Sequence, residues 1–578
     1  MPTTTTVSAH VAAALSAHLD HVFGVMGNGN AYFLDALERA TEVRFTAVRH
    51  EAGGVVAADA HFRASGRIAA ATATYGAGFT NTLTALAEAA QAHVPLVLVV
   101  GDEPTSGPRP WDVDQIALAS AVGARTYTVG RTDAAATTIL AIEHALSYRV
   151  PVVLAIPYDL AALDAGAVQP APDLRLPTPL APRGPFAGGV VTEIAAALAG
   201  ASRPFLLAGR GAWLAGADAV AALGELAEAT GAVTASTALG RGVFPDERFD
   251  LGVTGGFGAE GAMELVREAD VAVVFGASLN QFTMRFGDLF APGTRVFQVD
   301  ILPASTHPHV GGFVRGDAGL VARAIVEELE ELDALDALGA LGALGAEATL
   351  RQARGGAGWR ESVEIAALRE QPIAPSPDGL ADDGRLDPRA VARRIGELLP
   401  EDRVVVSDGG HFIGWANMYW PVASPDRMIM VGTAFQSIGL GFASVPGAAA
   451  AKPDSAIVLT TGDGGGLMAL ADLESAVRTA GGRGVAVVWN DAAYGAEINL
   501  YGLKGLAREP MLIPEVDFAG LAAAVGAEGV VVRELADLEA LATWASRPVA
   551  ERQFLLLDCR ISGTVVAPYQ EEIIRVNS

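Results

Sequence analysis

Two polar positions with metal-binding side chains follow two apolar stretches in the last third of the chain. Asp463 stands between glycines directly after one stretch, and Asn490-Asp491 ends the next. Carboxylate and amide oxygens are ligands for Mg²⁺, which often completes its coordination with phosphate oxygens. The glycines 464–466 lead into a helix N-terminus, whose free N–H groups suit a phosphate. The pattern predicts a site for Mg²⁺ and phosphate, although a capped strand-to-helix turn is the alternative for Asp463 alone.

The elements around these residues must bring the side chains together. Residues 455–461 (SAIVLTT) and 485–490 (VAVVWN) are expected to be buried strands. The residues between them predict a helix, ended by Gly481 and Gly482. Its apolar face is expected to consist of Leu467, Leu470, Leu473 and Val477. In a right-handed crossover both strands run the same way, so the polar positions emerge at the carboxyl edge of one sheet.

The same alternation of strand and helix extends over nearly the whole chain. With 578 residues, of which 51% are hydrophobic and 18% charged, the chain is expected to fold into two to four domains. Strand-length apolar runs alternate with Ala/Leu-rich helical stretches in three separate segments. This recurrence predicts an α/β protein with three doubly wound parallel-sheet domains.

The composition excludes several classes of partner. The net charge of −26 disfavours nucleic acid and anionic membranes, so small molecules are the expected partners. The single cysteine, Cys559, excludes an internal disulfide framework and fits a reducing compartment. The N-terminal residues do not read as a signal peptide, and no apolar run is long enough to span a membrane. We therefore expect a cytoplasmic protein.

The glycine-flanked Asp463, followed one helix and one strand later by Asn490-Asp491, resembles the cofactor motif of thiamine diphosphate-dependent enzymes. The resemblance implies that three groups bind Mg²⁺, namely Asp463, Asp491 and the main-chain carbonyl of Ala493. It also implies that nearby glycines belong to the cofactor site, namely Gly462, Gly464 and Gly465. The family has Asn where this chain has Asp491, a departure that keeps an oxygen ligand and adds a negative charge.

Other segments resemble further parts of the same family. An Arg-His-Glu segment ends in Glu51, which the resemblance implies contacts the pyrimidine ring of the cofactor and relays its proton. The segment TAFQSIGLGF implies that Ile438 props the cofactor in a bent form and that the carbonyl of Gln436 accepts from the aminopyrimidine. The segment SDGGHF places His411 and Phe412 along the diphosphate. Taken alone, Glu51 could be a helix-start residue, and His411 a solvated loop residue.

The resemblance covers nearly the whole chain and is nearest to the acetolactate synthase-like branch. It implies a pyrimidine-binding domain (1–165), a central domain (186–331), a linker (332–378), a diphosphate- and Mg-binding domain (379–560) and a C-terminal tail (561–578). It also implies a homodimer or homotetramer with the active site at the subunit interface. Glu51 would then come from one subunit, and Asp463 and Asp491 from the other.

The family chemistry predicts formation or cleavage of a carbon–carbon bond next to a carbonyl, with 2-oxo acids or aldehydes as substrates. Five residues match segments that face the reacting carbon in relatives: Asn28, Trp111, Asp112, Gln115 and Glu497. We expect the two ionisable ones, Asp112 and Glu497, to handle protons of the bound intermediate. Trp111 is expected to limit acceptor size, with core packing as the alternative.

Three other functions stay open. Because Glu497 matches a decarboxylase position, a simple 2-oxo acid decarboxylase or an acyloin lyase is one alternative. A flavin-linked 2-oxo acid oxidase is another, but residues 276–288 (GASLNQFTMRFGD) differ from the flavin segment of that branch, which argues against FAD. The third is a non-catalytic scaffold that keeps the fold.

Overall fold

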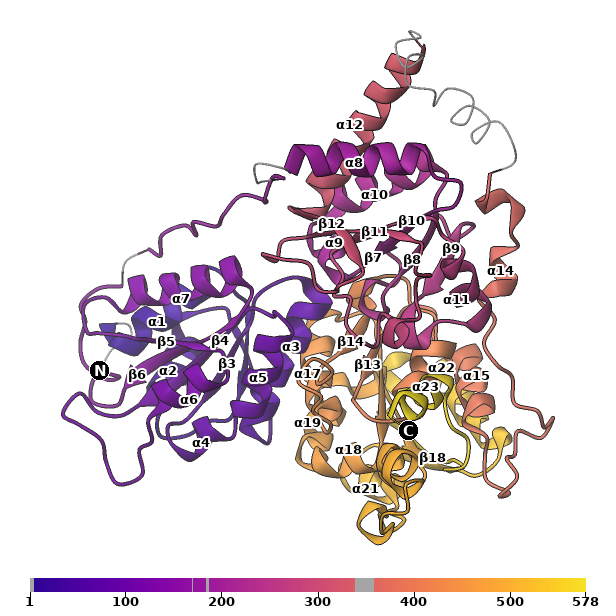
Figure 1. The fold of residues 1–578 in the computed structure, drawn as a ribbon. Helices are drawn as coiled ribbons and strands as arrows, with labels where there is room; N and C mark the ends of the chain where they lie inside the picture. Colours follow the sequence, from indigo (N-terminus) through magenta and orange to yellow (C-terminus); the bar gives the residue numbers. More distant parts are fainter. Residues whose placement is uncertain (1–4, 169, 183–186, 338–357, 578) are drawn as a thin grey trace. The chain divides into compact units, whose positions relative to one another are not determined.

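The computed structural model describes residues 5–168, 170–182, 187–337 and 358–577. These residues form three sheets of six strands each, and every strand pairing in them is parallel (Figure 1). Helices connect the strands, as parallel pairing requires. The predicted α/β class with three doubly wound parallel-sheet domains is confirmed.

The first sheet has the strand order β2-β1-β3-β4-β6-β5. Its strands are β1 (His21–Gly24), β2 (Arg44–Ala47), β3 (Ala70–Ala73), β4 (Leu96–Asp102), β5 (Arg125–Thr128) and β6 (Pro151–Pro157). Its helices are α1 (Val7–Ser16), α2 (Ala31–Ala40), α3 (Glu51–Ser65), α4 (Ala77–Thr80), α5 (Leu83–Gln91), α6 (Gln115–Ala121) and α7 (Ala134–Tyr148). Every residue of β4 and β6 is buried, as expected for strands covered on both faces.

The third sheet repeats this order as β14-β13-β15-β16-β18-β17. Its strands are β13 (Arg403–Ser407), β14 (Met428–Met430), β15 (Ala456–Gly462), β16 (Gly484–Asn490), β17 (Glu528–Val532) and β18 (Leu555–Arg560). The helices are α15 (Pro388–Leu398), α16 (Ile413–Tyr419), α17 (Gly441–Ala451), α18 (Asp463–Met468), α19 (Leu473–Ala480), α20 (Gly495–Glu497), α21 (Phe518–Ala524) and α22 (Glu539–Ser546). The chain therefore builds the same sheet topology twice.

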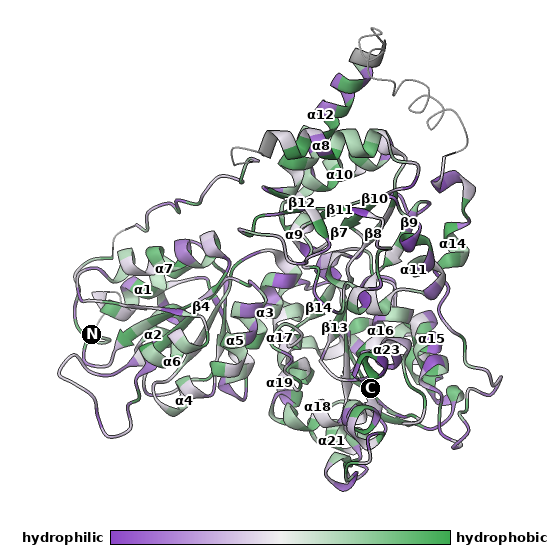
Figure 2. Ribbon diagram, viewed as in Figure 1, coloured by the Kyte–Doolittle hydropathy of each residue, from purple (hydrophilic) through white to green (hydrophobic). Residues whose placement is uncertain are grey.

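The central sheet has a different order, β12-β11-β10-β7-β8-β9, because the chain winds outward from the middle in both directions. Its strands are β7 (Pro204–Ala208), β8 (Val233–Ser236), β9 (Asp250–Val253), β10 (Val271–Phe275), β11 (Arg295–Asp300) and β12 (Val310–Arg315). Its helices are α8 (Ala187–Ala199), α9 (Arg210–Leu214), α10 (Ala217–Thr230), α11 (Glu260–Arg267), α12 (Ala318–Ala337) and α14 (Ile365–Leu368). Figure 2 colours much of these strands as hydrophobic.

Contacts group the chain into two compact units. One contains the first and third sheets (Met1–Pro177, Ala374–Ala416 and Asp426–Val565), and the other contains the central sheet (Thr178–Ile373, Asn417–Pro425 and Val566–Ser578). In the first unit α3 packs against α17 (Figure 1). A Cβ at Gly447 of α17 would lie 1.9 Å from the carbonyl oxygen of Ala57 of α3, so only glycine allows this approach.

A buried charge network joins helices of the first domain to the third domain. Arg63 of α3 donates to Asp59 and to Glu88 of α5, and all three side chains are at most 3% exposed. Arg63 also donates to the carbonyl of Met430 at 2.8 Å, and Glu88 accepts from the N–H of Phe435 at 2.7 Å. The first domain thereby holds the loop that follows β14.

A further helix lies in the C-terminal segment. Residues 561–578, predicted to be a tail, include helix α23 (Pro568–Asn577). The ring of Tyr569 packs edge-on against Phe257 and Phe282, with ring centres 5.3 and 5.8 Å apart, in the unit of the central sheet. Residues 338–357 of the predicted linker lie outside the described residues, and the domain boundaries stay a prediction. Among the described residues no helix is both long and apolar enough to cross a membrane.

Candidate active site

The structure brings the carboxylates of Asp463 and Asp491 together at the carboxyl edge of the third sheet. β15 and β16 are adjacent parallel strands; Asp463 begins α18 directly after β15, and Asp491 follows β16. Both side chains are buried. Burial and, next, the charge of Asp491 raise the pKa of Asp463 to about 7, while the Gly464 N–H at 2.8 Å opposes this rise. The two carboxylates therefore repel each other when no cation lies between them.

One oxygen of each carboxylate has no protein partner. Oδ2 of Asp463 and Oδ1 of Asp491 are buried and accept no hydrogen bond from the part of the chain that the structure describes. A buried carboxylate oxygen without a donor is costly, and a bound cation removes that cost. The donor set consists of oxygens, which suits a hard cation such as Mg²⁺.

His411 and Phe412 border this pair from the loop after β13. Nε2 of His411 lies 2.8 Å from Oδ2 of Asp491. Burial by itself lowers the pKa of His411, but the carboxylates of Asp491, Asp463 and Glu497 together outweigh it, so the pKa is raised overall. Phe412 is buried, and its ring leaves no room for a Cβ at Gly462, which would lie 2.8 Å from Cδ1 of the ring.

The other cofactor residues predicted on the third sheet lie on neighbouring loops. Ile438 is next to the loop after β13, since its Cγ2 would lie 3.3 Å from a Cβ at Gly409. Gln436 is exposed and has a left-handed backbone with φ of 57°. Ala493 is buried and forms a bridge with Leu512, following a left-handed turn at Ala492.

Glu51 is half-buried at the first turn of α3, where its Oε2 accepts from Nδ2 of Asn81 at 2.9 Å. Glu51 therefore lies on a helix of the first domain, whereas the other predicted cofactor residues lie at the ends of strands of the third sheet or in the segments that follow them.

The residues before Glu51 are held by the segment that follows Asp463. Oδ1 of the buried Asp472 accepts from the N–H of Arg49 at 3.1 Å, and the Arg49 side chain pairs with Glu474 at 2.7 Å. Arg478 donates to the carbonyl of Ala47 at 2.6 Å. This clamp, formed by Asp472, Glu474 and Arg478, fixes the turn that leads into Glu51.

The predicted helix over residues 467–480 is interrupted where this clamp begins. It consists of α18, a 3₁₀ turn at Leu470–Asp472, and α19, which ends at Gly481 with a φ of 51°. Leu473 and Val477 are buried, but Leu467 and Leu470 are only half-buried. The prediction of a single helix was therefore wrong. The chain turns at Asp472, where the carboxylate accepts a hydrogen bond from Arg49 of the first domain.

The substrate-side residues of the first domain form a polar and aromatic cluster. Asn28 donates to the hydroxyl of Tyr75 at 2.8 Å. The guanidinium of Arg109 lies 4.0 Å from the ring centre of Tyr75 and binds both oxygens of Asp112 at 2.8 Å. This hydrogen bonding by Arg109 lowers the pKa of Asp112. The contact favours a positioning role for Asp112 over the proton-handling role that we expected.

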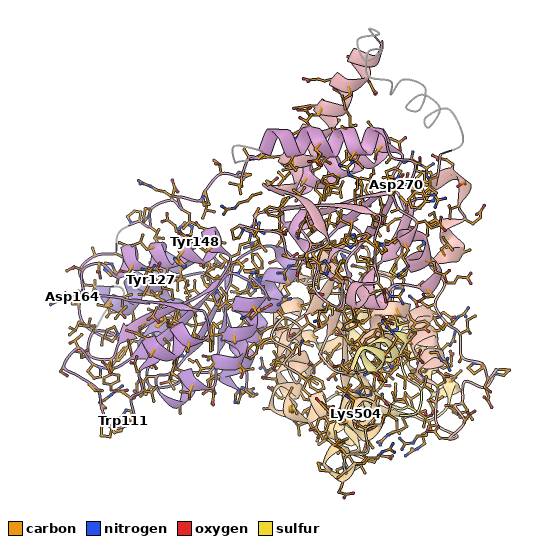
Figure 3. The ribbon with its side chains drawn as sticks, in the orientation of Figure 1. Trp111, Tyr127, Tyr148, Asp164, Asp270 and Lys504 are labelled. Carbon is orange, nitrogen blue, oxygen red and sulfur yellow. The ribbon has the colours of Figure 1, made fainter. Side chains whose placement is uncertain are left out.

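Trp111, Gln115 and Glu497 lie in three different environments. Trp111 is 60% exposed on a loop, as Figure 3 illustrates, so the alternative of core packing is wrong. Gln115 is buried. Its side-chain amide accepts from the Gly76 N–H at 3.0 Å and donates to the Gly101 carbonyl at 3.0 Å, so both ends of the amide are used in hydrogen bonds to the backbone. Glu497 is exposed and lies close enough to His411 to help raise the pKa of that histidine.

Family models of thiamine pyrophosphate enzymes match three stretches of the chain. The N-terminal thiamine pyrophosphate-binding domain matches residues 5–121, the central domain 191–329 and the C-terminal thiamine pyrophosphate-binding domain 408–559. The chain belongs to the thiamine pyrophosphate enzyme family. The first and third sheets carry its two cofactor-binding domains.

Several curated members of this family align with most of the chain. A sulfoacetaldehyde acetyltransferase of Roseovarius nubinhibens is 27% identical over 99% of this chain and 94% of its own length. One of Castellaniella defragrans is 28% identical over 92% of this chain and 88% of its own length. The acetolactate synthase isozyme 1 large subunit of Escherichia coli is 26% identical over 79% of this chain and 76% of its own length. These relatives support the acetolactate synthase-like branch.

Sequence reasoning missed a buried carboxylate that organises the cofactor loops. Oδ1 of Asp408 accepts from the N–H groups of Gly409, Gly439 and Leu440 at 2.8–3.2 Å. Its Oδ2 accepts from the Thr461 hydroxyl at 2.9 Å. Burial raises the pKa of Asp408 although these donors oppose the rise. The sequence does contain a feature that could have identified Asp408, because this Asp directly follows the strand VVVS, as Asp463 follows its own strand.

Proposed function

We propose that this chain is a thiamine diphosphate- and Mg²⁺-dependent enzyme that makes or breaks a carbon–carbon bond next to a carbonyl group. The observation that carries the proposal is the pair of buried, unpartnered oxygens on Asp463 and Asp491 at one sheet edge. Membership of the thiamine pyrophosphate enzyme family supplies the cofactor class. Bound thiamine diphosphate supplies a nucleophilic carbon and an electron sink for such reactions.

The residues would share the work as follows. Asp463, Asp491 and the carbonyl of Ala493 would hold Mg²⁺, which would anchor the diphosphate of the cofactor. Ile438 would support the bound cofactor, and the Glu51 carboxyl would hold or release a proton beside its pyrimidine ring. Trp111 limits the space for the acceptor.

The active assembly would be a homodimer or homotetramer. This part of the proposal is supported by membership of the thiamine pyrophosphate enzyme family, for which the resemblance implies a site shared by two chains. A second chain would supply Glu51 to each metal-side half of the site, so every complete site would need two chains.

The preferred reaction is 2-oxo acid decarboxylation followed by ligation of the acyl group to an acceptor, as the relatives named acetolactate synthase suggest. The second candidate is acetyl transfer with sulfoacetaldehyde, because relatives named for that reaction align with 99% and 92% of the chain. In the cluster around Tyr75, the Arg109 charge is already neutralised by Asp112. This pairing favours an acceptor without an anionic group at that position.

Titration calorimetry of thiamine diphosphate with the metal-free protein tests the cofactor site. We expect binding that requires Mg²⁺ and is weakened by Asp463→Ala and by Asp491→Ala. Asp454→Ala, an exposed aspartate at the opposite end of β15, is the matched control and should bind like the wild type. Equal affinity with and without Mg²⁺ in all variants would show that the two aspartates only terminate strands.

The loaded protein is then incubated with a panel of 2-oxo acids, aldehydes and sulfoacetaldehyde, and the products are identified by mass spectrometry. Ligation products from 2-oxo acids support the preferred reaction. Release of sulfite from sulfoacetaldehyde, with transfer of its acetyl group to an added nucleophile such as inorganic phosphate, supports the second. No product from any substrate, in a protein that binds the cofactor, would favour the scaffold alternative.

A further inference from the structure

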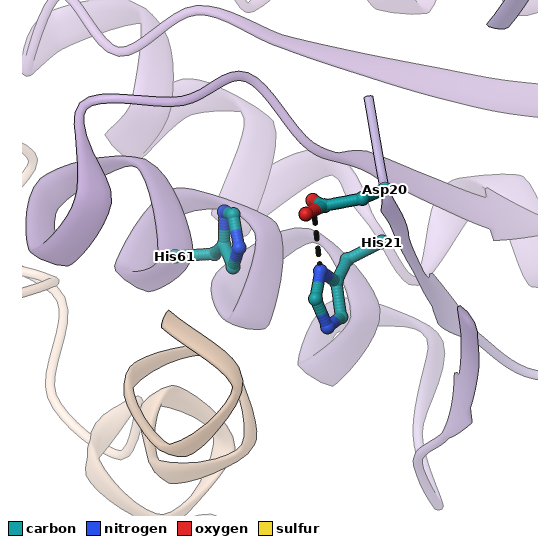
Figure 4. A group of neighbouring side chains, drawn as sticks. All are labelled: Asp20, His21 and His61. Carbon is teal, nitrogen blue, oxygen red and sulfur yellow. Dashed lines mark hydrogen bonds and ion pairs between the residues drawn. The ribbon is translucent and has the colours of Figure 1, made fainter. Parts of the chain in front are cut away.

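A second group of metal-ligating side chains lies at the opposite end of the first sheet from Asn28. Asp20 and His21 stand at the amino end of β1, and His61 faces them from α3 (Figure 4). One ligand atom of each residue lies within 4.8 Å of those of the other two. His21 and His61 are 8% and 2% exposed, and their ring centres are 5.0 Å apart. The proposed reaction uses none of these residues.

The hydrogen bonds around His61 leave one of its ring nitrogens ready to bind a metal. Nδ1 lies 3.3 Å from the carbonyl of Arg67, and the hydroxyl of Ser65 gives its proton to the carbonyl of His61. Nδ1 therefore carries the proton and donates it to Arg67, so Nε2 keeps its lone pair. A backbone carbonyl on the far ring nitrogen is the usual support for a metal-binding histidine.

We propose that Asp20, His21 and His61 bind a divalent transition-metal ion of the zinc, cobalt and nickel class. Two imidazoles with one carboxylate suit these ions, whereas Mg²⁺ prefers a shell made of oxygens. The ion joins the start of β1 to α3 and leaves further positions for water. Its site lies roughly 15 Å along α3 from Glu51, since each helical residue rises about 1.5 Å.

Nδ1 of His21 lies 2.9 Å from Oδ1 of Asp20 (Figure 4), a contact that a bound ion must replace. Arg67 is a second competitor for this site. Its guanidinium pairs with Oδ2 of Asp20, and the Arg67 side chain is 63% exposed. An arriving cation must displace it or repel it. Removing the Arg67 charge should therefore tighten metal binding, whereas removing a ligand should weaken it.

The test titrates Co²⁺ into the full-length protein in excess Mg²⁺ and thiamine diphosphate, and follows the visible absorption of the bound ion. We expect the wild type to bind one equivalent of Co²⁺ with nitrogen ligation. The Co²⁺ affinity should fall roughly tenfold or more in His61→Gln and in Asp20→Asn, and it should rise in Arg67→Gln. His307→Gln is the matched control, because His307 and His309 form another close histidine pair. Zn²⁺ should raise the thermal unfolding temperature of the wild type but not of Asp20→Asn.

Each outcome decides the proposal. Asp20 is partly exposed, so Asp20→Asn should fold even if His61→Gln does not. Unchanged Co²⁺ binding in folded Asp20→Asn, no nitrogen-ligated Co²⁺ in the wild type, or loss of binding in His307→Gln alone would overturn it. Because His411 contacts Asp491 at 2.8 Å, the titration is repeated in Asp463→Ala, in which the nitrogen-ligated Co²⁺ signal of Asp20, His21 and His61 should remain.

Discussion

Asp491 shows how one residue can change the charge of a site without changing its ligand type. An Asn-to-Asp exchange keeps an oxygen donor but adds a negative charge beside Asp463. The contact of 2.8 Å with His411, whose pKa is raised overall against the effect of burial, offsets part of that charge. The departure from the family pattern therefore has a compensating neighbour within the same site.

Glu51 is the residue on which the proposed chemistry depends most directly. We expect Glu51→Gln to keep thiamine diphosphate affinity and lose at least about 100-fold in turnover, the lower end of the usual contribution of acid–base catalysis. The amide can still accept the hydrogen bond from Asn81, so the fold should be kept. Steady-state kinetics at saturating cofactor measures the loss, with Glu38→Gln on the exposed face of α2 as the control. Turnover close to that of the control would remove Glu51 from the mechanism.

Elements position Glu51 through contacts with distant parts of the sequence. Asp472 lies between α18 and α19 and binds the N–H of Arg49, although most of the chain separates the two residues. The same segment begins with Asp463. One connected stretch of the third domain therefore carries a proposed metal ligand and also holds the turn before the proposed proton relay.

Asp472→Ala should separate positioning from cofactor binding. We expect the turnover number to fall roughly tenfold or more, since a displacement of about 1 Å at a reacting group can cost 100-fold, while thiamine diphosphate affinity stays unchanged. Glu474→Gln, which removes the half-buried charge partner of Arg49 and Arg478, should cost less than about 1 kcal/mol of stability and little activity. Kinetics and calorimetry on both variants measure these effects. A lower unfolding temperature with unchanged turnover would show that Asp472 is only structural.

The sequence was informative about elements whose signal is local. Repeated strands and helices predicted the three sheets, and the Asp after an apolar run predicted where Asp463 lies. The strand orders were not readable, because four-residue strands such as His21–Gly24 and Val233–Ser236 have too little sequence to specify a partner. Contacts such as Asp472 with Arg49 were also hidden, since no local pattern marks a pair 423 residues apart. The interrupted helix 467–480 was missed for the same reason.

At the scale of the molecule, the contact between α3 and α17 joins the two cofactor-binding domains of one chain. Gly447→Val should force the helices apart, because even a Cβ would overlap the Ala57 carbonyl. We expect the free energy of unfolding to fall by about 1–3 kcal/mol or more, as in other overpacked cores. The backbone amides of both helices should also exchange their hydrogens faster. Gly224→Ala in α10, where the nearest atom is 4.0 Å away, should instead stabilise the protein by about 0.4–1 kcal/mol. Equal protection of α3 in both variants would contradict this role of Gly447.

The Arg63–Met430 contact has a consequence for synthesis of the chain. The two residues are 367 positions apart, and the whole central domain is encoded between them. At about 5–20 residues per second, a ribosome needs roughly 20–70 s to cover that distance. During this time the nascent first domain has Arg63 and Glu88 in place, but it lacks the Met430 carbonyl and the Phe435 N–H that they bind in the complete chain. The buried charges on this face of the first domain therefore lack their backbone hydrogen-bond partners until the loop after β14 has been synthesised.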